Sequence, residues 1–205
     1  MNSPTWYRPE FERDSCGFGL IAQMDNKPSH WLVKTSINSL ARLTHRGAVA
    51  ADGKSGDGCG LLMKKPDGFL RAVAAEAGFT LTAEYGVGTV FLNTDPALAQ
   101  TGRAILDEEL AKEGLQVAGW RVMPVDPDAC GDESRRTMPR IEQVFVNAPE
   151  GLEGLELERR LYLARRRAGK RTQPNDPVYY VVNLSGRVLS YNCLLYTSPS
   201  PRDCS

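Results

Sequence analysis

A cysteine lies at the start of an apolar segment, behind a short polar stretch, and this position allows nucleophilic chemistry. Cys16 follows Asp14 and Ser15 and precedes the sequence Gly-Phe-Gly-Leu. Cleavage before Cys16 would give its thiol, with a reference pKa of about 8.5, an α-amino group of pKa about 8 on the same residue. That residue would then supply both nucleophile and base, and neither of the two histidines would be required. From the residues alone, a buried structural thiol is the alternative interpretation.

A loop rich in glycine and aspartate, residues 51–60, is the second candidate for chemistry, and it reads ADGKSGDGCG. Its Gly-Lys-Ser is not a phosphate loop, because that motif needs another glycine five residues before Gly53, and the residue there is Ala48. The later glycines are spaced G-x-G-x-G and precede a strand, whereas a dinucleotide fingerprint precedes a helix. Asp52 and Asp57 suit calcium by type, but the loop lacks a bidentate acid at its end. We therefore interpret both aspartates as turn-forming residues.

The composition excludes several classes of protein. The 205 residues include 25 basic and 25 acidic side chains, so the net charge is zero, which argues against a general nucleic-acid or membrane-surface binder. No apolar run approaches the roughly 18 residues that span a bilayer, and residues 1–15 lack the apolar stretch of a secretory signal. We expect a cytoplasmic protein. The five cysteines form no C-x-x-C pair, which favours neither a zinc site nor a disulfide framework.

Helix and strand signals alternate along the chain and predict an α/β or α+β fold. Strands are expected at 17–24, 61–63, 85–92, 117–123 and 141–146. Helices are expected after a Ser29 cap as far as Arg46 and Gly47, at 67–77, from Pro96 to a stop at Gly114, and at 155–170. Segments 178–184 and 187–191 are predicted to form a hairpin around Ser185 and Gly186. The arginines of segment 159–171 are interpreted as a solvated helix face paired with Glu156 and Glu158.

Five motifs together resemble a known family. They are CGFGLIA at 16–22, ARLTHRGA at 41–48, ADGKSGDGCG at 51–60, PRIEQVFVNA at 139–148 and ERRL at 158–161. Their combination is similar to the N-terminal glutamine amidotransferase domain of the glutamate synthase large chain. The resemblance covers nearly all of residues 12–192, and the motifs together are highly specific.

The resemblance implies a class II, N-terminal-nucleophile amidotransferase whose fold class is α+β, a four-layer αββα sandwich. Residues 1–15 would be a propeptide, and Cys16 would be the processed N-terminal nucleophile that attacks the side-chain amide of L-glutamine. Arg46 and Gly47, in the His-Arg-Gly motif, are expected beside the nucleophile, where they would shape the glutamine pocket. A purely structural role in that loop is the alternative for both residues.

For the whole enzyme, the resemblance implies that the released ammonia passes through a tunnel to a second site. There it meets 2-oxoglutarate, and FMN reduces the resulting iminoglutarate to glutamate with electrons that arrive through an iron–sulfur cluster from NADPH or ferredoxin. We expect no cofactor and no metal in this stretch of chain itself. The expected partners are L-glutamine, the remainder of the large chain and a small NADPH-oxidising subunit, with no nucleic acid and no membrane.

The last residues, 193–205, read CLLYTSPSPRDCS and break the alternation of the segment before them. The string 193–203 resembles one translated frame of a transposase-type sequencing-library adapter, and a natural Ser/Pro-rich terminus is the alternative. We expect residues 16–192 to form a partial amidotransferase domain, incomplete at its C-terminus. We also expect it to be inactive by itself, because the residues with which the family grips glutamine and forms the oxyanion hole would lie further on.

Two other functions stay open at this point. One is a structural or regulatory domain of the same fold, which would never expose Cys16 as an N-terminus. The other is an amidotransferase that delivers ammonia to a sugar or a purine precursor. Enzymes of that kind usually place the cysteine directly after the initiator methionine, and the 15 residues before Cys16 disfavour them.

Overall fold

Two antiparallel sheets and their flanking helices form the part of the chain that the computed structural model describes, residues 17–43, 51–55 and 58–193. The helices are α1 (His30–Ala41), α2 (Asp67–Glu76), α3 (Pro96–Lys112), α4 (Asp132–Thr137) and α5 (Gly154–Thr172), with a short 3-10 helix, η3 (Pro127–Ala129). The strands are β1 (Cys59–Lys64), β2 (Tyr85–Leu92), β3 (Gln116–Val122), β4 (Arg140–Asn147), β5 (Tyr180–Ser185) and β6 (Val188–Cys193).

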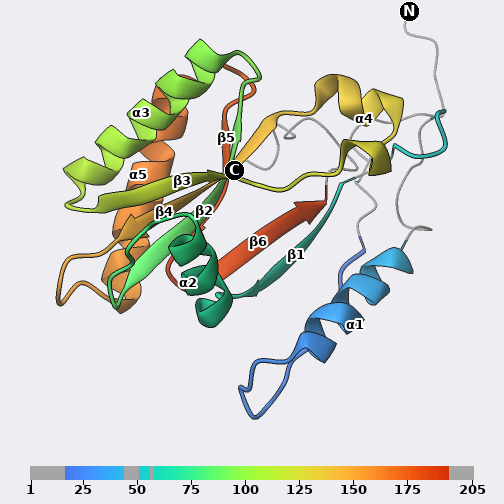
Figure 1. Ribbon diagram of the computed structural model, residues 1–205, viewed down its shortest axis with the longest axis horizontal. Helices are drawn as coiled ribbons and strands as arrows, with labels where there is room; N and C mark the ends of the chain where they lie inside the picture. Colours follow the sequence, from blue (N-terminus) through green and yellow to red (C-terminus); the bar gives the residue numbers. More distant parts are fainter. Residues whose placement is uncertain (1–16, 44–50, 56–57, 194–205) are drawn as a thin grey trace, which may run out of the picture.

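The larger sheet has the strand order β3-β4-β2-β5, and α3 and α5 lie side by side over one of its faces (Figure 1). Residues Leu157, Leu161, Ala164 and Ala168 of α5 recur at helical spacing and are buried against the sheet. Gly102 lets α3 approach closely, because a Cβ there would lie 2.8 Å from a ring carbon of Tyr179. This helix–sheet contact is the main hydrophobic core.

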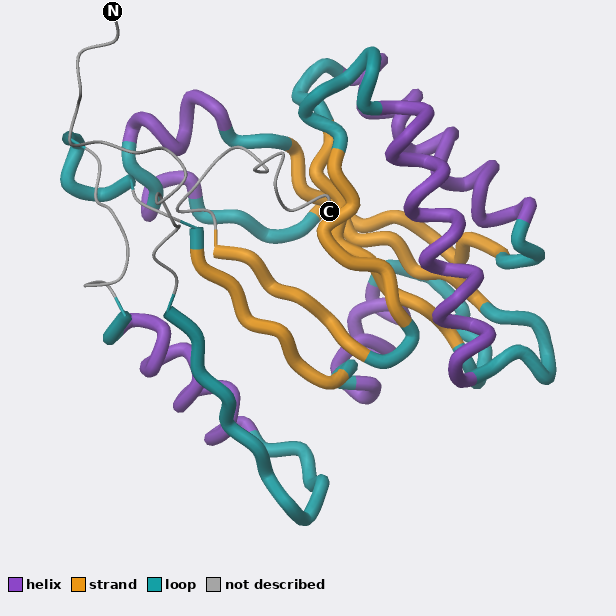
Figure 2. Tube along the Cα trace, turned by 180° about the vertical axis from the view of Figure 1, so that it is seen from behind, coloured by secondary structure: helices purple, strands orange, loops and turns teal. Residues whose placement is uncertain are grey.

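The smaller sheet pairs β1 with β6 and lies on the opposite side of the larger sheet from α3 and α5 (Figure 2). A second core, built from Leu70 and Ala74 of α2, Tyr85, Val87, Phe145 and Leu189, fills the space on this side. The order of layers runs from α3 and α5 through the two sheets to α1, which contacts β1 (Figure 1). The predicted α+β class with αββα layers is confirmed, although α1 itself buries no residue.

Strands β5 and β6 do not form the hairpin that the sequence predicted. β5 pairs with β2, whereas β6 pairs with β1 in the other sheet, so the chain crosses between sheets at Gly186 and Arg187. Glu158 of α5 holds this crossing, because its carboxylate accepts hydrogen bonds from the Ser185 hydroxyl and the Gly186 amide, both at 2.8 Å. The Ser185 Oγ in turn accepts from the amides of Arg187 and Val188 at 3.0 and 3.1 Å. Glu158 therefore bonds to the crossing segment rather than to an arginine. The predicted pairing of acidic side chains with the arginines of α5 holds for Glu156 and not for Glu158.

Local signals placed most other elements correctly. Ser29 caps α1 by accepting from the Leu32 amide at 3.3 Å, and Asp95 caps α3 by accepting from the Ala97 amide at 2.8 Å. Gly114 follows α3 with a φ of 73°, a conformation that favours glycine. The helix after Ser29, however, ends at Ala41 and not at Arg46 and Gly47.

The strand predicted at 17–24 is wrong, since this segment is irregular. Its apolar side chains are exposed, with Phe18 at 94% and Met24 at 96% of their full accessible area. The apolar run contains Gly17 and Gly19, which weaken a strand, and no described strand pairs with it. Within the described residues, no helix is both long and apolar enough to cross a membrane.

The crossing generates a first prediction. Replacing Glu158 by alanine removes a charged acceptor from one hydroxyl and one backbone amide, so we expect the free energy of unfolding to fall by about 1.5–3 kcal/mol in urea denaturation. The matched change Glu156→Ala, which breaks ion pairs to the exposed Arg159 and the partly buried Arg160, is expected to cost no more than about 1 kcal/mol. Equal effects of the two changes would contradict the role of Glu158.

Candidate functional site

The residues to which the sequence assigned chemistry fall outside the described part of the chain. Cys16 belongs to residues 1–16, and Arg46 and Gly47 belong to residues 44–50. Asp57 likewise lies in the pair 56–57. Their roles therefore remain predictions, and the described residues that flank them are the ones that define the surroundings of the site.

Several described segments that border these gaps, together with α4, lie at one end of the long axis of the molecule. The C-terminal end of α1, the 51–55 turn, the start of β1 and α4 all lie at the right-hand end in Figure 1. The view from behind in Figure 2 places them together at the same end. The last pair of the β1–β6 ladder, Cys59 with Cys193, is also there. α4 and the end of β6 thus lie at the same end of the two-stranded sheet as the 51–55 turn, although both are far from that turn in sequence.

Asp52 organises the turn that precedes β1. Its Oδ1 accepts from the amides of Lys54 at 3.0 Å and Ser55 at 2.7 Å, and its Oδ2 accepts from the Ser55 hydroxyl at 2.6 Å. Gly53, between them, has a φ of 69°, which suits glycine in a tight turn. The prediction that Asp52 forms a turn is confirmed.

The same turn is fastened to α4, a contact that the sequence did not reveal. The Glu133 amide donates to Asp52 Oδ2 at 3.3 Å, and the Ser134 amide donates to Ser55 Oγ at 3.2 Å. Gly131 makes this approach possible, because a Cβ there would lie 2.3 Å from both Asp52 Oδ2 and Ser55 Oγ. Ser55 is only 4% exposed as a result. The first turn of α4 therefore fixes the 51–55 turn in place.

The charge on Asp52 is strongly favoured in this setting. The hydrogen bond from the Ser55 hydroxyl, followed by those from the Lys54 and Ser55 amides, holds the pKa of this carboxyl far below its usual range. The carboxylate is thus occupied by hydrogen-bond donors at both of its oxygens. No group of three or more histidine, cysteine, aspartate or glutamate side chains suited to a metal ion occurs among the described residues.

A row of polar side chains crosses the interior between the two sheets. The ladders place Arg121, Gln143, Thr89 and Asn183 next to one another on successive strands of the larger sheet. Thr89 Oγ1 donates to the carbonyl of Ser190, and Asn183 Nδ2 donates to that of Val188, each at 3.4 Å. Buried polar groups in a strand are costly unless they are hydrogen-bonded. Here Thr89 and Asn183 bond to the backbone of β6. These bonds help to set the position of β6, the strand with which β1 pairs.

Comparison with known proteins gives consistent results along the chain. The sequence profile of the class-II glutamine amidotransferases matches residues 16–200. Ferredoxin-dependent glutamate synthase 2 of Synechocystis is 39% identical over 186 residues, which cover 88% of this chain. The NADPH-dependent glutamate synthase large chains of Bacillus subtilis and Azospirillum brasilense are 35% and 38% identical over 190 residues, covering 92% and 90% of it. The chain spans about 12% of the length of each of these three relatives.

The Asp52 turn gives a second prediction. Asp52→Asn removes the negative charge and presents an NH₂ group to donors, so we expect several-fold faster hydrogen exchange at the Ser55, Glu133 and Ser134 amides. Because the pKa of Asp52 is lowered in the folded protein, the stabilisation is present above its unfolded pKa of about 3.9 and is lost as the pH falls through the lower folded value.

Exchange in the unchanged protein should therefore stay slow at these amides down to about pH 4 and accelerate only in stronger acid. Asp128→Asn is the matched control, because the Asp128 side chain is 95% exposed. The same acceleration in both variants would show that Asp52 does not hold the turn against α4.

Proposed function

Because the chain belongs to the class-II glutamine amidotransferases, we propose that it is the glutamine-hydrolysing part of a glutamate synthase large chain. The observation that carries the proposal is the extent of the family match, which starts at Cys16 and continues to residue 200. A match that starts at this cysteine supports a mature domain with Cys16 as its first residue. The identities of 35–39% to glutamate synthases support a glutamate synthase over an amidotransferase that delivers ammonia to a sugar or a purine precursor.

The proposed reaction uses Cys16 alone as nucleophile and base. Once residues 1–15 are removed, the neutral α-amine takes the thiol proton, and the thiolate attacks the side-chain carbonyl carbon of L-glutamine. The tetrahedral oxyanion collapses, the C–N bond breaks, and the α-ammonium gives its proton to the departing NH₂ group, which leaves as ammonia. Water then attacks the glutamyl thioester, which releases glutamate and restores the thiol.

The surroundings of the nucleophile have two proposed tasks. The oxyanion needs donors aimed at the position where its charge develops, and the substrate needs a pocket of fixed shape. We assign Arg46 and Gly47 to the glutamine pocket. The Asp52 turn and its attachment to α4 support this assignment, because they fix residues 51–55, which directly follow the segment that contains Arg46 and Gly47.

Further proposals concern the protein as a whole. The ammonia would react with 2-oxoglutarate at a second site, with reduction by FMN and an iron–sulfur cluster. The described residues offer no ligand set for such a cluster, so no step here is assigned to these groups. NADPH and ferredoxin, named in the titles of the relatives, are the candidate electron donors, and a small NADPH-oxidising subunit is a candidate partner. We place the protein in the cytoplasm, without nucleic acid or membrane as a partner.

We propose a division of the chain into three parts that agrees with Cys16 as the N-terminal nucleophile. Residues 1–15 are a propeptide, residues 16–192 are a partial amidotransferase domain, and residues 193–205 are a non-native tail, although the family match also takes in residues 193–200. Under this organisation the 205-residue chain by itself hydrolyses no glutamine. Thiol-dependent release of ammonia from glutamine by the purified chain would contradict it.

The third prediction concerns the full gene product. With Cys16→Ala we expect glutamine-dependent glutamate formation to fall by roughly a thousandfold or more, because no other group replaces the nucleophile. Formation of glutamate from added ammonia should persist, because the second site then receives its substrate from solution. Both rates are measured in the same preparation.

Cys130→Ala is the control, since Cys130 is a buried thiol that lies between η3 and α4. It should leave both rates within a few-fold of the unchanged enzyme. An equal loss of both rates in the Cys16 variant would indicate a packing role for this cysteine. Unchanged rates would indicate a vestigial domain.

A further inference from the structure

Gly131 lies where α4 meets the turn before β1, and it is the N-cap residue of α4. Its backbone has a φ of −71° and a ψ of 164°, an extended conformation that residues with a side chain adopt without strain. A Cβ at this position would nevertheless lie 2.3 Å from both Asp52 Oδ2 and Ser55 Oγ and 2.7 Å from the Ser55 amide nitrogen. The requirement for glycine therefore comes from the closeness of α4 to the 51–55 turn and not from the backbone conformation.

The turn has little freedom to make room for a side chain at position 131. The amide nitrogen of Ser55 belongs to the backbone, so a rotation of side chains alone does not relieve the overlap. The Ser55 hydroxyl is also held, because it donates to Asp52 Oδ2 at 2.6 Å and accepts from the Ser134 amide at 3.2 Å. Non-bonded carbon atoms pack at roughly 3.5–4.0 Å, so a methyl group here would separate α4 and the turn by on the order of 1 Å.

The other side of α4 is joined to the larger sheet. Arg135 of α4 donates to the carbonyls of Pro127 and Asp128 in η3, at 2.7 and 3.3 Å. The end of α4 is followed almost directly by β4, a strand that is paired along both of its edges. Because α4 is attached in this way, we expect an added side chain at position 131 to displace the 51–55 turn rather than the helix.

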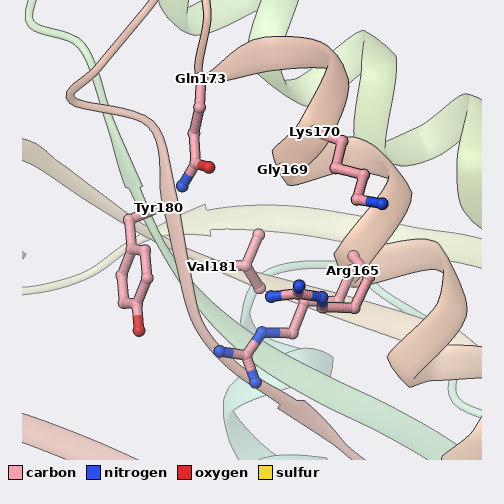
Figure 3. A pocket seen from close by; sticks show the side chains of 7 residues that line it. Arg165, Gly169, Lys170, Gln173, Tyr180 and Val181 are labelled. Carbon is pink, nitrogen blue, oxygen red and sulfur yellow. The ribbon is translucent and has the colours of Figure 1, made fainter. Parts of the chain in front are cut away.

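A hollow that the described residues form elsewhere does not belong to this site. It has a volume of about 150 Å³ and lies between α5 and the start of β5, where Arg165, Lys170 and Gln173 line it (Figure 3). α5 covers the face of the larger sheet that is turned away from β1 and β6 (Figure 2). The 51–55 turn leads into β1, so the hollow and the turn lie on opposite sides of the larger sheet.

We propose that Gly131 and Ser55 are positioning residues for the hydrolysis of glutamine. Gly131 leaves the space in which the turn approaches α4, and the Ser55 hydroxyl links the turn to the first turn of that helix. A displaced turn would shift the segment directly before it, which contains Arg46 and Gly47, the residues assigned above to the glutamine pocket. This role rests on the proposed function, because the pocket is part of that proposal. Gly131 and Ser55 act through the turn and not by contact with the substrate.

The fourth prediction concerns Gly131→Ala in the full gene product. We expect the KM for glutamine in glutamate formation to rise by about tenfold or more while kcat stays within about threefold, because a displaced pocket weakens binding of the ground state and the transition state alike. The rate with added ammonia should stay unchanged, since ammonia does not use the pocket. A variant that is merely less stable would instead lose active enzyme, which lowers kcat and leaves KM as it was.

Gly68→Ala is the matched control, because a Cβ at Gly68 would meet nothing within 4 Å. It should leave KM and both rates unchanged. Ser55→Ala is a second variant that removes the hydroxyl between Asp52 and the Ser134 amide without adding volume. It should raise KM in the same direction, and it decides the question if Gly131→Ala fails to fold and loses the ammonia-dependent rate as well.

An unchanged KM in a folded Gly131→Ala or Ser55→Ala enzyme would overturn the positioning role, and so would an equal rise in Gly68→Ala. In each of these cases the unchanged enzyme still hydrolyses glutamine, so the proposed function would stand. Failure of the unchanged full gene product to use glutamine, while it still uses ammonia, would contradict the proposed function itself.

Discussion

The arrangement of the molecule depends on the point where the chain passes from one sheet to the other. In the described part, β1 has a single strand partner, β6, and β6 is joined to the main sheet through the Gly186–Arg187 crossing. Glu158 fixes that crossing by accepting from Ser185 and Gly186, while the polar row between the sheets bonds to the backbone of β6. β1, which follows the 51–55 turn, is therefore positioned by contacts made far from it in sequence.

Two carboxylates perform the same physical task at two junctions. Glu158 at the crossing and Asp52 at the turn before β1 each accept hydrogen bonds from backbone amides and from a serine hydroxyl. Hydrogen bonds to a charged acceptor are stronger than those between neutral groups. Here they also satisfy backbone amides that have no partner in the strand pairing of the sheets. Rigid turns of this kind suit a site whose nucleophile must lie within about 3 Å of its target.

Sequence patterns predicted the local structure much better than the contacts between distant segments. Caps at Ser29 and Asp95, and the whole of β2, follow from signals within a few residues. The pairing of β5 and β6 does not, because a turn signal fixes a change of direction and not the partner of each strand. The hydrogen bond from the Glu133 amide to Asp52 joins residues 81 positions apart. The six-residue helix α4 is too short to show a hydrophobic period in the sequence. The sequence predicted the type of chemistry through Cys16, whereas the α4 contact that holds the neighbouring turn came only from the structure.

In the proposed enzyme, Cys16 becomes the N-terminal residue and acts as the nucleophile. The most direct test of this claim is N-terminal sequencing and peptide mass analysis of the full gene product after incubation with a diazoketone analogue of glutamine. The predicted result is a chain that begins at Cys16 and carries a single adduct on the sulfur of that residue. A chain that still carries residues 1–15, or an adduct on any other cysteine, would contradict the claim.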